Sequence, residues 1–338
     1  MTEKLRNKIV LVTGGTGSFG NYIVNRLLKY DVKEIRILSR DEKKQYDMKI
    51  NYKHNPKLKF FIGDIRDYVR VEAVMENVDI VYQAAALKHV AVCENSPFEA
   101  VKTNIVGVEN VIRAALKFKV EKIICVSTDK AVKPVNVMGM TKAIQERLML
   151  SANLSPENKG TVICVVRYGN VLLSRGSVVP YFRRLLTRGE TITITHEEMT
   201  RFLLTLDDAI DLVMFATEHA LGGETFVKKA PAALITHIAK VLSEDAGKSA
   251  EYKVIGKFPG EKLHEILITE EELDRTEDKG DYFTVHPWWN KQIFTDLNEE
   301  YSSGMEIIKE DSEIRALIAY ADDKARNVHI EDGEFSKI

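Results

Sequence analysis

Long apolar runs are missing from this 338-residue sequence, and none reaches the roughly 18 residues that a membrane-spanning helix needs. The N-terminal stretch MTEKLRNKIVLVTGG passes from a charged start into a strand-like run, without the apolar core and cleavage site of a signal peptide. Neither charge is in excess, because 48 Lys and Arg face 50 Asp and Glu. We therefore expect a cytoplasmic protein with no membrane or nucleic-acid partner.

Cysteine is scarce as well. The three residues, Cys93, Cys125 and Cys164, are odd in number and far apart, and two of them lie in apolar strand-like runs. This distribution fits neither a disulfide framework nor a metal-ligand spacing, and it is typical of buried thiols in a reducing compartment. We expect no metal site.

Strand-like apolar runs alternate with helix-like segments through the first half of the chain. The runs are KIVLVTGG, EIRILSR, LKFFIGDIRD, VDIVYQAAA, KIICVSTD and TVICVVRYGN, and segments such as FEAVKTNIVGVENVIRAALKF lie between them with helical spacing. Continuous Val and Ile runs separated by helices are typical of a parallel sheet covered on both faces. The pattern predicts an α/β fold, a Rossmann-like doubly wound domain with right-handed crossovers over residues 1–170.

After about residue 170 the alternation gives way to short helices and strands around GEKLHE and DYFTVHPWWN. We expect a smaller α/β substrate lobe over residues 171–295, with some later segments returning to the first domain. Residues 296–338 carry mixed charges and one clear helix candidate, SEIRALIAYADDKAR, so they are expected to form a tail or an interface arm.

The stretch VTGGTGSFG follows the first strand and opens the first helix. Gly14, Gly17 and Gly20 fit TGxxGxxG, and Gly15, Gly17 and Gly20 fit GxGxxG. Small residues let the backbone approach a pyrophosphate, and the helix N-terminus supplies amides and a partial positive charge. In this strand–turn–helix context the motif indicates dinucleotide binding, and a tight turn without a ligand is the alternative.

The end of the second strand favours NADP over NAD. The stretch ILSRDEKKQ offers Ser39 and Arg40, followed by Lys43, where NAD sites usually carry an acidic residue for the ribose 2′-hydroxyl. A guanidinium with further positive charge suits a 2′-phosphate. The alternative is a solvated charged turn built on Asp41 and Glu42.

Later strand ends contribute further groups to the expected nucleotide site. Asp64 ends the third strand and is expected to accept from the adenine amino group, or alternatively to cap the next helix. The small side chains at 84–86 leave room for the ribose and nicotinamide. Lys88 follows the fourth strand and is expected to face the same cleft.

Residues 127–142, STDKAVKPVNVMGMTK, carry the expected reacting groups beyond the fifth strand. Asp129 and Lys130 are an adjacent carboxylate and amine, which can do acid and base work if burial brings their pKa values near neutrality. Surface ions on a loop are the alternative. Lys142 is expected to reach the cofactor, and Met138 stands four residues before it, where many nicotinamide enzymes with this layout carry a tyrosine. A thioether cannot take a proton.

Together, TGGTGSFG, SRDEKKQ, AAALKHV, STDKA, MGMTK, RYGNV and SRGSVVP resemble the UDP-N-acetylglucosamine 4,6-dehydratases of the extended short-chain dehydrogenase/reductase superfamily. MTRF and GEK belong to the same pattern, which covers residues 8 to about 288. The methionine before GxxK is similar to the branch that inverts C5 in capsule and O-antigen polysaccharide biosynthesis. The resemblance implies tightly bound NADP, UDP-GlcNAc as the substrate, and a homo-oligomer, either a hexamer or a dimer.

The implied reaction is an internal redox cycle. C4 of the sugar is oxidised, C5 loses a proton, C6 loses its hydroxyl as water, and C6 is then reduced while C5 is reprotonated from the opposite face. The product would be UDP-2-acetamido-2,6-dideoxy-β-L-arabino-hex-4-ulose. We hypothesise that Lys130 is the C5 base, that Asp129 takes the C4 hydroxyl proton and delivers it to the C6 oxygen, and that Thr128 orients the C4 hydroxyl.

The resemblance implies three sets of site residues, which overlap. The catalytic set is Asp129, Lys130, Thr128, Lys142 and, at the tyrosine position, Met138. The cofactor set is Thr13, Gly14, Thr16, Gly17, Ser18, Phe19, Gly20, Ser39, Arg40, Lys43, Asp64, Ile65, Ala84, Ala85, Ala86, Lys88, Asn104, Ser127, Lys142, Tyr168, Asn170 and Val171. The substrate set is Lys88, Asp129, Lys130, Asn170, Arg175, Ser177, Val178, Pro180, Thr193, Thr195, Met199, Arg201, Glu261 and Lys262, with a surface salt bridge as the alternative for Arg201.

Two rival functions stay open. A retaining 4,6-dehydratase or a 4-epimerase of another UDP-sugar would share the scaffold, but both usually need the tyrosine that Met138 replaces. A non-catalytic NADP-binding regulator would keep the glycine turn and lose the reacting groups, whereas Asp129, Lys130, Lys142 and Lys88 are all present.

Overall fold

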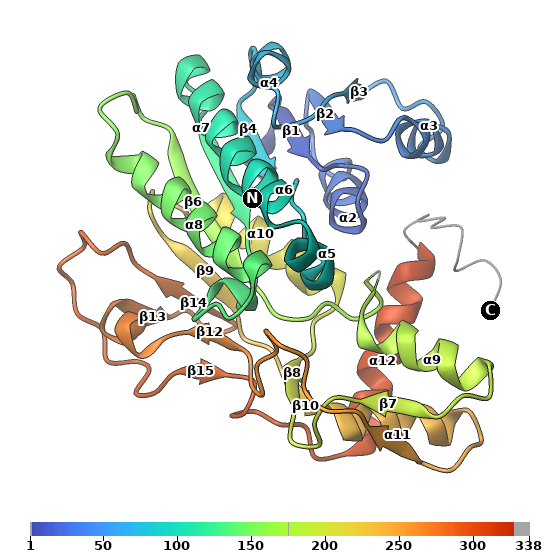
Figure 1. Ribbon diagram of the computed structural model, residues 1–338. Coiled ribbons are helices and arrows are strands. Elements are labelled where there is room, and N and C mark those ends of the chain that lie inside the picture. Colours follow the sequence, from blue (N-terminus) through green and yellow to red (C-terminus); the bar gives the residue numbers. More distant parts are fainter. Residues whose placement is uncertain (1, 175, 328–338) are drawn as a thin grey trace.

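The computed structural model describes residues 2–174 and 176–327. In this part of the chain the largest sheet has nine strands in the order β13-β14-β9-β6-β5-β4-β1-β2-β3 (Figure 1). Its parallel strands are β1 (Ile9–Thr13), β2 (Glu34–Ser39), β3 (Leu58–Ile62), β4 (Ile80–Gln83), β5 (Lys122–Val126), β6 (Val162–Arg167) and β9 (Thr225–Lys228). An antiparallel hairpin, β14 (Tyr282–Val285) and β13 (Thr276–Asp278), extends the β9 edge. The predicted α/β fold with a mostly parallel sheet is confirmed.

Helices cover both faces of this sheet. Successive side chains of a strand point to opposite faces, so a strand that is apolar throughout needs a covering layer on each side. Val10 and Val12 of β1 belong to one buried cluster with α2 (Ser18–Leu27) and α10 (Leu206–His219). Leu11 belongs to a second cluster with α4 (Tyr68–Met75), α7 (Gly107–Phe118) and α8 (Val137–Ser151). This explains why the strand runs are apolar throughout.

Shorter helical elements connect these layers. They are α1 (Thr2–Leu5), α3 (Glu42–Asn51), α5 (Val90–Asn95), α6 (Pro97–Val101), a π-helical turn (Lys102–Val106) that leads into α7, and the 3₁₀ turns η2 (Asp129–Ala131), η3 (Ala152–Leu154) and η4 (Glu270–Arg275).

A smaller lobe lies at the lower right in Figure 1. Its helices are α9 (Val178–Thr187), α11 (Ile235–Asp245) and α12 (Asp311–Asn327). Two two-stranded pairings accompany them: β7 (Ile192–Ile194) with β11 (Tyr252–Val254), and β8 (Thr200–Phe202) with β10 (Ala232–Leu234). A third pairing, β12 (Ile266–Ile268) with β15 (Tyr301–Ser302), lies beside β13 and β14 (Figure 1). The expected return of later segments to the large sheet involves α10, β9, β13 and β14.

The last described helix, α12, belongs to the core of this lobe. Ile314 and Ile318 are buried in the same cluster as residues of α9 and α11, and Arg183 of α9 forms an ion pair with Asp322 at 2.6 Å. Residues 311–327 are therefore a packed helix rather than a free tail, and residues 328–338 lie outside the described residues. None of the helices in 2–174 and 176–327 combines the length and apolarity needed to cross a membrane.

Candidate active site

The glycine turn after β1 brings the backbone close to the neighbouring strand end. Gly14 has a φ of +66°, and a Cβ atom there would lie 2.9 Å from the Cα atom of Ala85. A Cβ atom at Gly20 would overlap the carbonyl group of Gly15. Gly17 is the N-cap of α2 and supplies no side chain, so the first-turn amides of the helix face an uncovered space. The turn therefore has the form that a pyrophosphate requires.

A cavity of about 760 Å³ opens over this turn at the carboxyl ends of β1 to β4. Of the expected cofactor residues, those that line it are Gly14, Thr16, Gly17, Ser18, Phe19, Gly20, Ser39, Arg40, Asp64, Ile65, Ala84, Ala85, Ala86 and Lys88. The sequence did not point to Lys44, His89, Val92 and Thr103, which line it as well. Within the described residues the Oγ1 atom of Thr103 is buried without a hydrogen-bond partner, which fits a cavity built to receive a polar ligand.

The cavity is not lined by three of the expected cofactor residues, Thr13, Lys43 and Asn104. Thr13 donates to Gln83 at 2.6 Å and accepts from the amide of Ala84 at 3.1 Å, which fixes the end of β4. Asn104 accepts from the amide of Leu87 at 2.8 Å. Lys43 points outward to Asp47, at 2.6 Å, and the next lysine along α3 lines the cavity in its place.

The end of the cavity beside β2 and β3 is bordered by charged side chains. The Arg40 guanidinium is about half exposed and lies 3.5 Å from the Asp64 carboxylate, which also accepts from Arg66 at 2.7 Å. Burial alone would raise the pKa of Asp64, but the hydrogen bonds from Arg66 and the charge of Arg40 outweigh it and lower the pKa. The alternative role of Asp64 as the cap of the next helix is wrong, because Asp67 caps α4. Asp41, which follows Arg40, caps α3.

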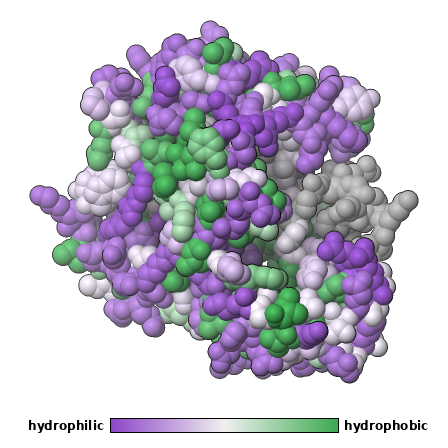
Figure 2. Space-filling model, in the orientation of Figure 1, coloured by the Kyte–Doolittle hydropathy of each residue, from purple (hydrophilic) through white to green (hydrophobic). Residues whose placement is uncertain are grey.

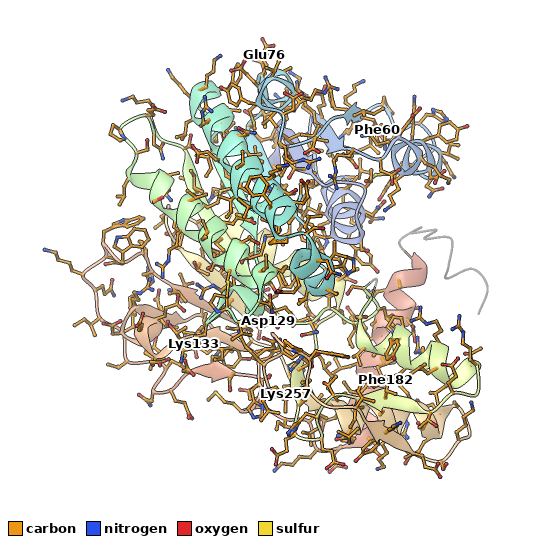
Figure 3. All side chains as sticks on the ribbon, viewed as in Figure 1. Phe60, Glu76, Asp129, Lys133, Phe182 and Lys257 are labelled. Atoms are coloured by element: carbon orange, nitrogen blue, oxygen red, sulfur yellow. The ribbon has the colours of Figure 1, made fainter. Side chains whose placement is uncertain are left out.

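The reacting pair lies where β5 ends, at the junction with the smaller lobe (Figure 3). Asp129 is fully buried, and its Oδ1 atom accepts from Lys130 Nζ at 3.0 Å and from Thr128 Oγ1 at 2.9 Å. The Oδ2 atom has no hydrogen-bond partner in the part of the chain that the structure describes. A buried carboxylate oxygen without a donor is costly, so this oxygen is a candidate acceptor for a ligand hydroxyl.

A second buried carboxylate, which the sequence did not single out, faces the same lysine. Glu265 is 2% exposed and its Oε1 atom lies 3.3 Å from Lys130 Nζ. Burial raises the pKa of Asp129, and Glu265 adds to this against the attraction of Lys130. Burial alone would lower the pKa of Lys130, but the two carboxylates outweigh it and raise the pKa. The two shifts favour the ammonium form of Lys130, and of the pair only Asp129 has a pKa that moves towards neutrality.

Other expected groups of this region are held by protein partners. Lys142 is buried and donates to the carbonyl of Val126 at 2.7 Å and to Gln145 at 2.9 Å, which occupies two of the three donors of its ammonium. Burial lowers the pKa of Lys142. Ser127 donates to Glu146 at 2.5 Å, and Met138 is buried in an apolar cluster with Cys93 and Ala100. Neither of the last two presents a group for proton transfer.

The sheet domain and the lobe approach one another around Asp129. Asn170 follows β6, and Ser177 is the N-cap of α9, whose first turn holds Val178 and Pro180. The Asn170 Oδ1 and Ser177 Oγ atoms are buried without partners among the described residues. Lys262 reaches across from the lobe to the carbonyl oxygens of Asp129 (3.4 Å) and Val132. Asn170 and Ser177 therefore have side-chain oxygens that a ligand could bind, as expected of substrate residues. Arg175 lies outside the described residues.

The remaining expected residues have partners within their own units. Arg201 is buried and donates to the carbonyl of Lys262 at 3.1 Å, so the alternative of a surface salt bridge is wrong. Thr193 bonds to Tyr181, Thr195 donates to the sulfur of Met199, Glu261 accepts from the amide of Phe258, Tyr168 packs in the core, and Val171 bridges to Leu204. Residues 2–174 and 176–327 contain no cluster of His, Cys, Asp and Glu suited to a metal ion.

Comparisons with known proteins agree with this architecture. A family model described as a polysaccharide biosynthesis protein matches residues 10–287. A protein of Rickettsia canadensis (strain McKiel) named UDP-glucose 4-epimerase is 49% identical over 283 residues, which are 82% of this chain and 83% of that protein. The X-ray structure of Pen from Bacillus thuringiensis has a TM-score of 0.88 at 38% identity and covers 95% of this chain and 100% of its own.

A more distant structure shares the fold alone. DesIV, a dTDP-glucose 4,6-dehydratase from Streptomyces venezuelae solved with NAD and TYD bound, has a TM-score of 0.68 at 19% identity. The likeness covers 75% of this chain and 86% of that chain.

Proposed function

This chain belongs to the polysaccharide biosynthesis protein family, and we propose that it is an NADP-dependent UDP-N-acetylglucosamine 4,6-dehydratase that inverts C5. Such an enzyme is a hydro-lyase that prepares a 4-keto-6-deoxy sugar nucleotide for surface polysaccharide or glycan synthesis. The observation that carries the proposal is the buried Asp129–Lys130 pair beyond the end of β5, the strand that pairs with β4, whose following residues line the cavity. The unpartnered Oδ2 atom of Asp129 would act as the proton acceptor that Met138 cannot be.

The cavity residues fit a dinucleotide phosphate. The Gly14–Gly20 turn and the start of α2 would hold the pyrophosphate, and Arg40 with Lys44 would hold the 2′-phosphate at the end of β2. The unpartnered Oγ1 atom of Thr103 is a further polar group for the ligand. When bound, NADP would supply reversible redox chemistry at C4 and C6 of the sugar.

The protein groups divide the proton transfers between them. Asp129 Oδ2 accepts the proton of the C4 hydroxyl, while Thr128 holds the carboxylate through Oδ1. The same Oδ2 atom then delivers that proton to the C6 oxygen, which leaves as water. Lys130 Nζ, once in its amine form, removes the C5 proton and passes it to solvent, and a solvent proton returns to C5 on the opposite face. Asn170, Ser177, Lys262 and the α9 N-terminus are the groups we propose for the sugar and diphosphate.

The second candidate is a 4-epimerase of a UDP-sugar, which would be an isomerase. The name of the Rickettsia canadensis relative favours it. An epimerase also needs a group that takes the C4 hydroxyl proton, and Asp129 would serve here too. The two candidates differ at C5 and C6, because only the dehydratase removes the C5 proton and the C6 hydroxyl.

The test is incubation with UDP-GlcNAc in deuterated water, followed by mass spectrometry and NMR of the product. We expect loss of one water, deuterium at C5 and the L-arabino configuration. The D-xylo configuration would identify a retaining dehydratase. An unchanged elemental composition with inversion at C4 would identify an epimerase, and no product from UDP-GlcNAc or other UDP-hexoses would favour the regulator.

The expected homo-oligomer has a candidate contact surface on the helices. Exposed apolar side chains of Phe98, Val106, Met140 and Ile144 lie on α6, the π-helical turn and α8. Figure 2 shows hydrophobic residues gathered on the face that carries α7 and α8. We propose that a second copy covers this surface. Ile144→Glu should then lower the mass measured by sedimentation equilibrium, and an unchanged mass would place the contact elsewhere.

A further inference from the structure

Glu265 stands out because three cations converge on one buried carboxylate. Its Oε1 atom lies 3.3 Å from Lys130 Nζ and 3.8 Å from Arg201 Nε, and its Oε2 atom lies 3.6 Å from Lys262 Nζ. Oε2 makes no hydrogen bond within the described residues. Burying a carboxylate costs desolvation free energy, which is offset only if nearby positive charges interact with it. We therefore expect Glu265 to affect the charge state of these three cations.

The backbone around Glu265 fixes this position. Its amide donates to Ser303 Oγ at 2.9 Å, and its carbonyl accepts from the amide of Ser303 at 2.8 Å, directly before the β12–β15 pairing. Lys130 belongs to η2 of the sheet domain, whereas Arg201 and Lys262 belong to the lobe. Glu265 therefore joins the reacting lysine to the lobe that we propose holds the sugar nucleotide.

We propose that Glu265 is a positioning residue of the reacting centre, which holds the Lys130 ammonium between two buried carboxylates and thereby sets the pH at which Lys130 becomes a base. The proposal rests on the proposed function, because it assigns Lys130 its charge during C5 deprotonation. It goes beyond the acid–base pair itself, since the sequence pattern gave Glu265 no role.

The direction of its effect follows from the charges that face Lys130. Asp129 and Glu265 favour the ammonium, whereas the nearby positive charges of Arg201 and Lys262 disfavour it. Removing the Glu265 charge leaves one carboxylate against these two cations, so the pKa of Lys130 must fall. The limb of the pH–rate profile that rises as Lys130 loses its proton must then move to lower pH.

The experiment compares wild type, Glu265→Gln and Glu265→Asp by the pH dependence of kcat for loss of water from UDP-GlcNAc. We expect the rising limb of Glu265→Gln to move down by at least about 1 pH unit, which is about tenfold more of the amine at a given pH. Glu265→Asp, whose carboxylate is withdrawn by about 1.5 Å, should give an intermediate shift. An unmoved limb in a folded Glu265→Gln would overturn the proposal.

The matched control is Glu272→Gln. Glu272 is another buried carboxylate, but it binds Arg167 at 2.8 Å. We expect this variant to lose stability while its rising limb stays in place. A shift equal to that of Glu265→Gln would mean that the limb reports general loosening of the protein, which would overturn the role of Glu265.

A second measurement separates this proposal from the proposed function. The Lys130 side chain is titrated directly by NMR of ¹³C-labelled lysine, with its signal assigned by its loss in Lys130→Met. A lower pKa in the Glu265 variants supports the proposal even if wild type dehydrates no UDP-sugar, and an unchanged pKa overturns it. If Glu265→Gln does not fold, the titration of Glu265→Asp decides.

Discussion

Ser127 donates a hydrogen bond to the carboxylate of Glu146 at 2.5 Å, and both side chains are buried. Glu146 also accepts from Arg167, whose guanidinium binds Glu272 of η4 at 2.8 Å. Ser127, which follows β5, is therefore hydrogen-bonded to a buried set of ion pairs that connects α8, β6 and η4. We therefore propose that its hydroxyl holds the loop in front of Asp129.

We expect Ser127→Ala to affect stability more than turnover. The variant removes one of the two donors to the Oε1 atom of Glu146, which still accepts from Arg167 Nε at 3.0 Å. Loss of a hydrogen bond to a charged group costs about 1.5–3 kcal/mol in free energy of unfolding. Urea denaturation measures this loss, and kcat should stay within about tenfold of wild type. Asp129→Asn should lose at least about 100-fold in kcat, because an amide neither takes nor delivers the proton. Equal losses of kcat in the two variants would contradict the structural role of Ser127.

The stability of the protein should depend on the charge of Asp129. Burial raises its pKa above 3.8, and the carboxylate of Glu265 adds to this against the attraction of Lys130. The folded state therefore holds this proton more tightly than the unfolded chain, so the contribution of Asp129 to stability falls as the pH rises from about 3.8 through the raised pKa. Asp129→Asn removes this dependence.

Urea denaturation of wild type and Asp129→Asn at a series of pH values measures the effect. The wild-type free energy of unfolding should decrease relative to that of the variant as the pH rises above about 4. Lys130→Met serves as a control for the loss of the ion pair. A wild type that gains stability relative to Asp129→Asn over this range would mean that the attraction of Lys130 dominates.

The sequence predicted the parts of this site that local pattern determines. In a parallel sheet the carboxyl ends of the strands lie at one edge, where ligands bind. This rule places the glycine turn, the small residues after β4 and the Asp129–Lys130 pair at the same edge. Glu265 lies far along the chain, and only the fold of the lobe brings it to Lys130. No local pattern in GEKLHE distinguishes it from the neighbouring charged residues.

Helix phase explains a finer difference. Asp41 caps α3, so Lys43 and Lys44 lie about 100° apart around the first turn, and only Lys44 faces the cavity. The sequence identified the basic cluster but not the lysine. Lys142 was expected to reach the cofactor, but its ammonium donates to the carbonyl of Val126 and to the side-chain oxygen of Gln145. Spacing along one helix does not reveal these partners.

This phase gives a test of cofactor choice. We expect Arg40→Gln and Lys44→Gln each to weaken NADP binding about 10- to 100-fold, which corresponds to about 1.4–2.8 kcal/mol, because each removes a cation beside the proposed 2′-phosphate. The affinity for NAD should change less than threefold, or about 0.6 kcal/mol. Isothermal titration with both dinucleotides measures the two constants.

Lys43→Gln is the matched control for this test, since Lys43 is exposed and paired with Asp47 outside the cavity. NADP affinity in this variant should equal that of wild type. A loss of NADP affinity in Lys43→Gln as large as that in Lys44→Gln would mean that α3 rotates when the dinucleotide binds. Equal losses of NAD and NADP affinity would mean that these cations do not bind the 2′-phosphate.

The glycine turn should tolerate no side chain at Gly20, where a Cβ atom would overlap the carbonyl group of Gly15. Gly20→Ala must push α2 away from the turn, so we expect loss of the copurified dinucleotide, measured by its absorbance after release in acid. Gly247→Ala is the control, because φ is +67° there and no atom lies within 4 Å of the added methyl group. It carries backbone strain of about 1 kcal/mol and should lower the melting temperature while leaving the dinucleotide bound. Full retention of the dinucleotide in Gly20→Ala would contradict a pyrophosphate site built on close contact between α2 and β1.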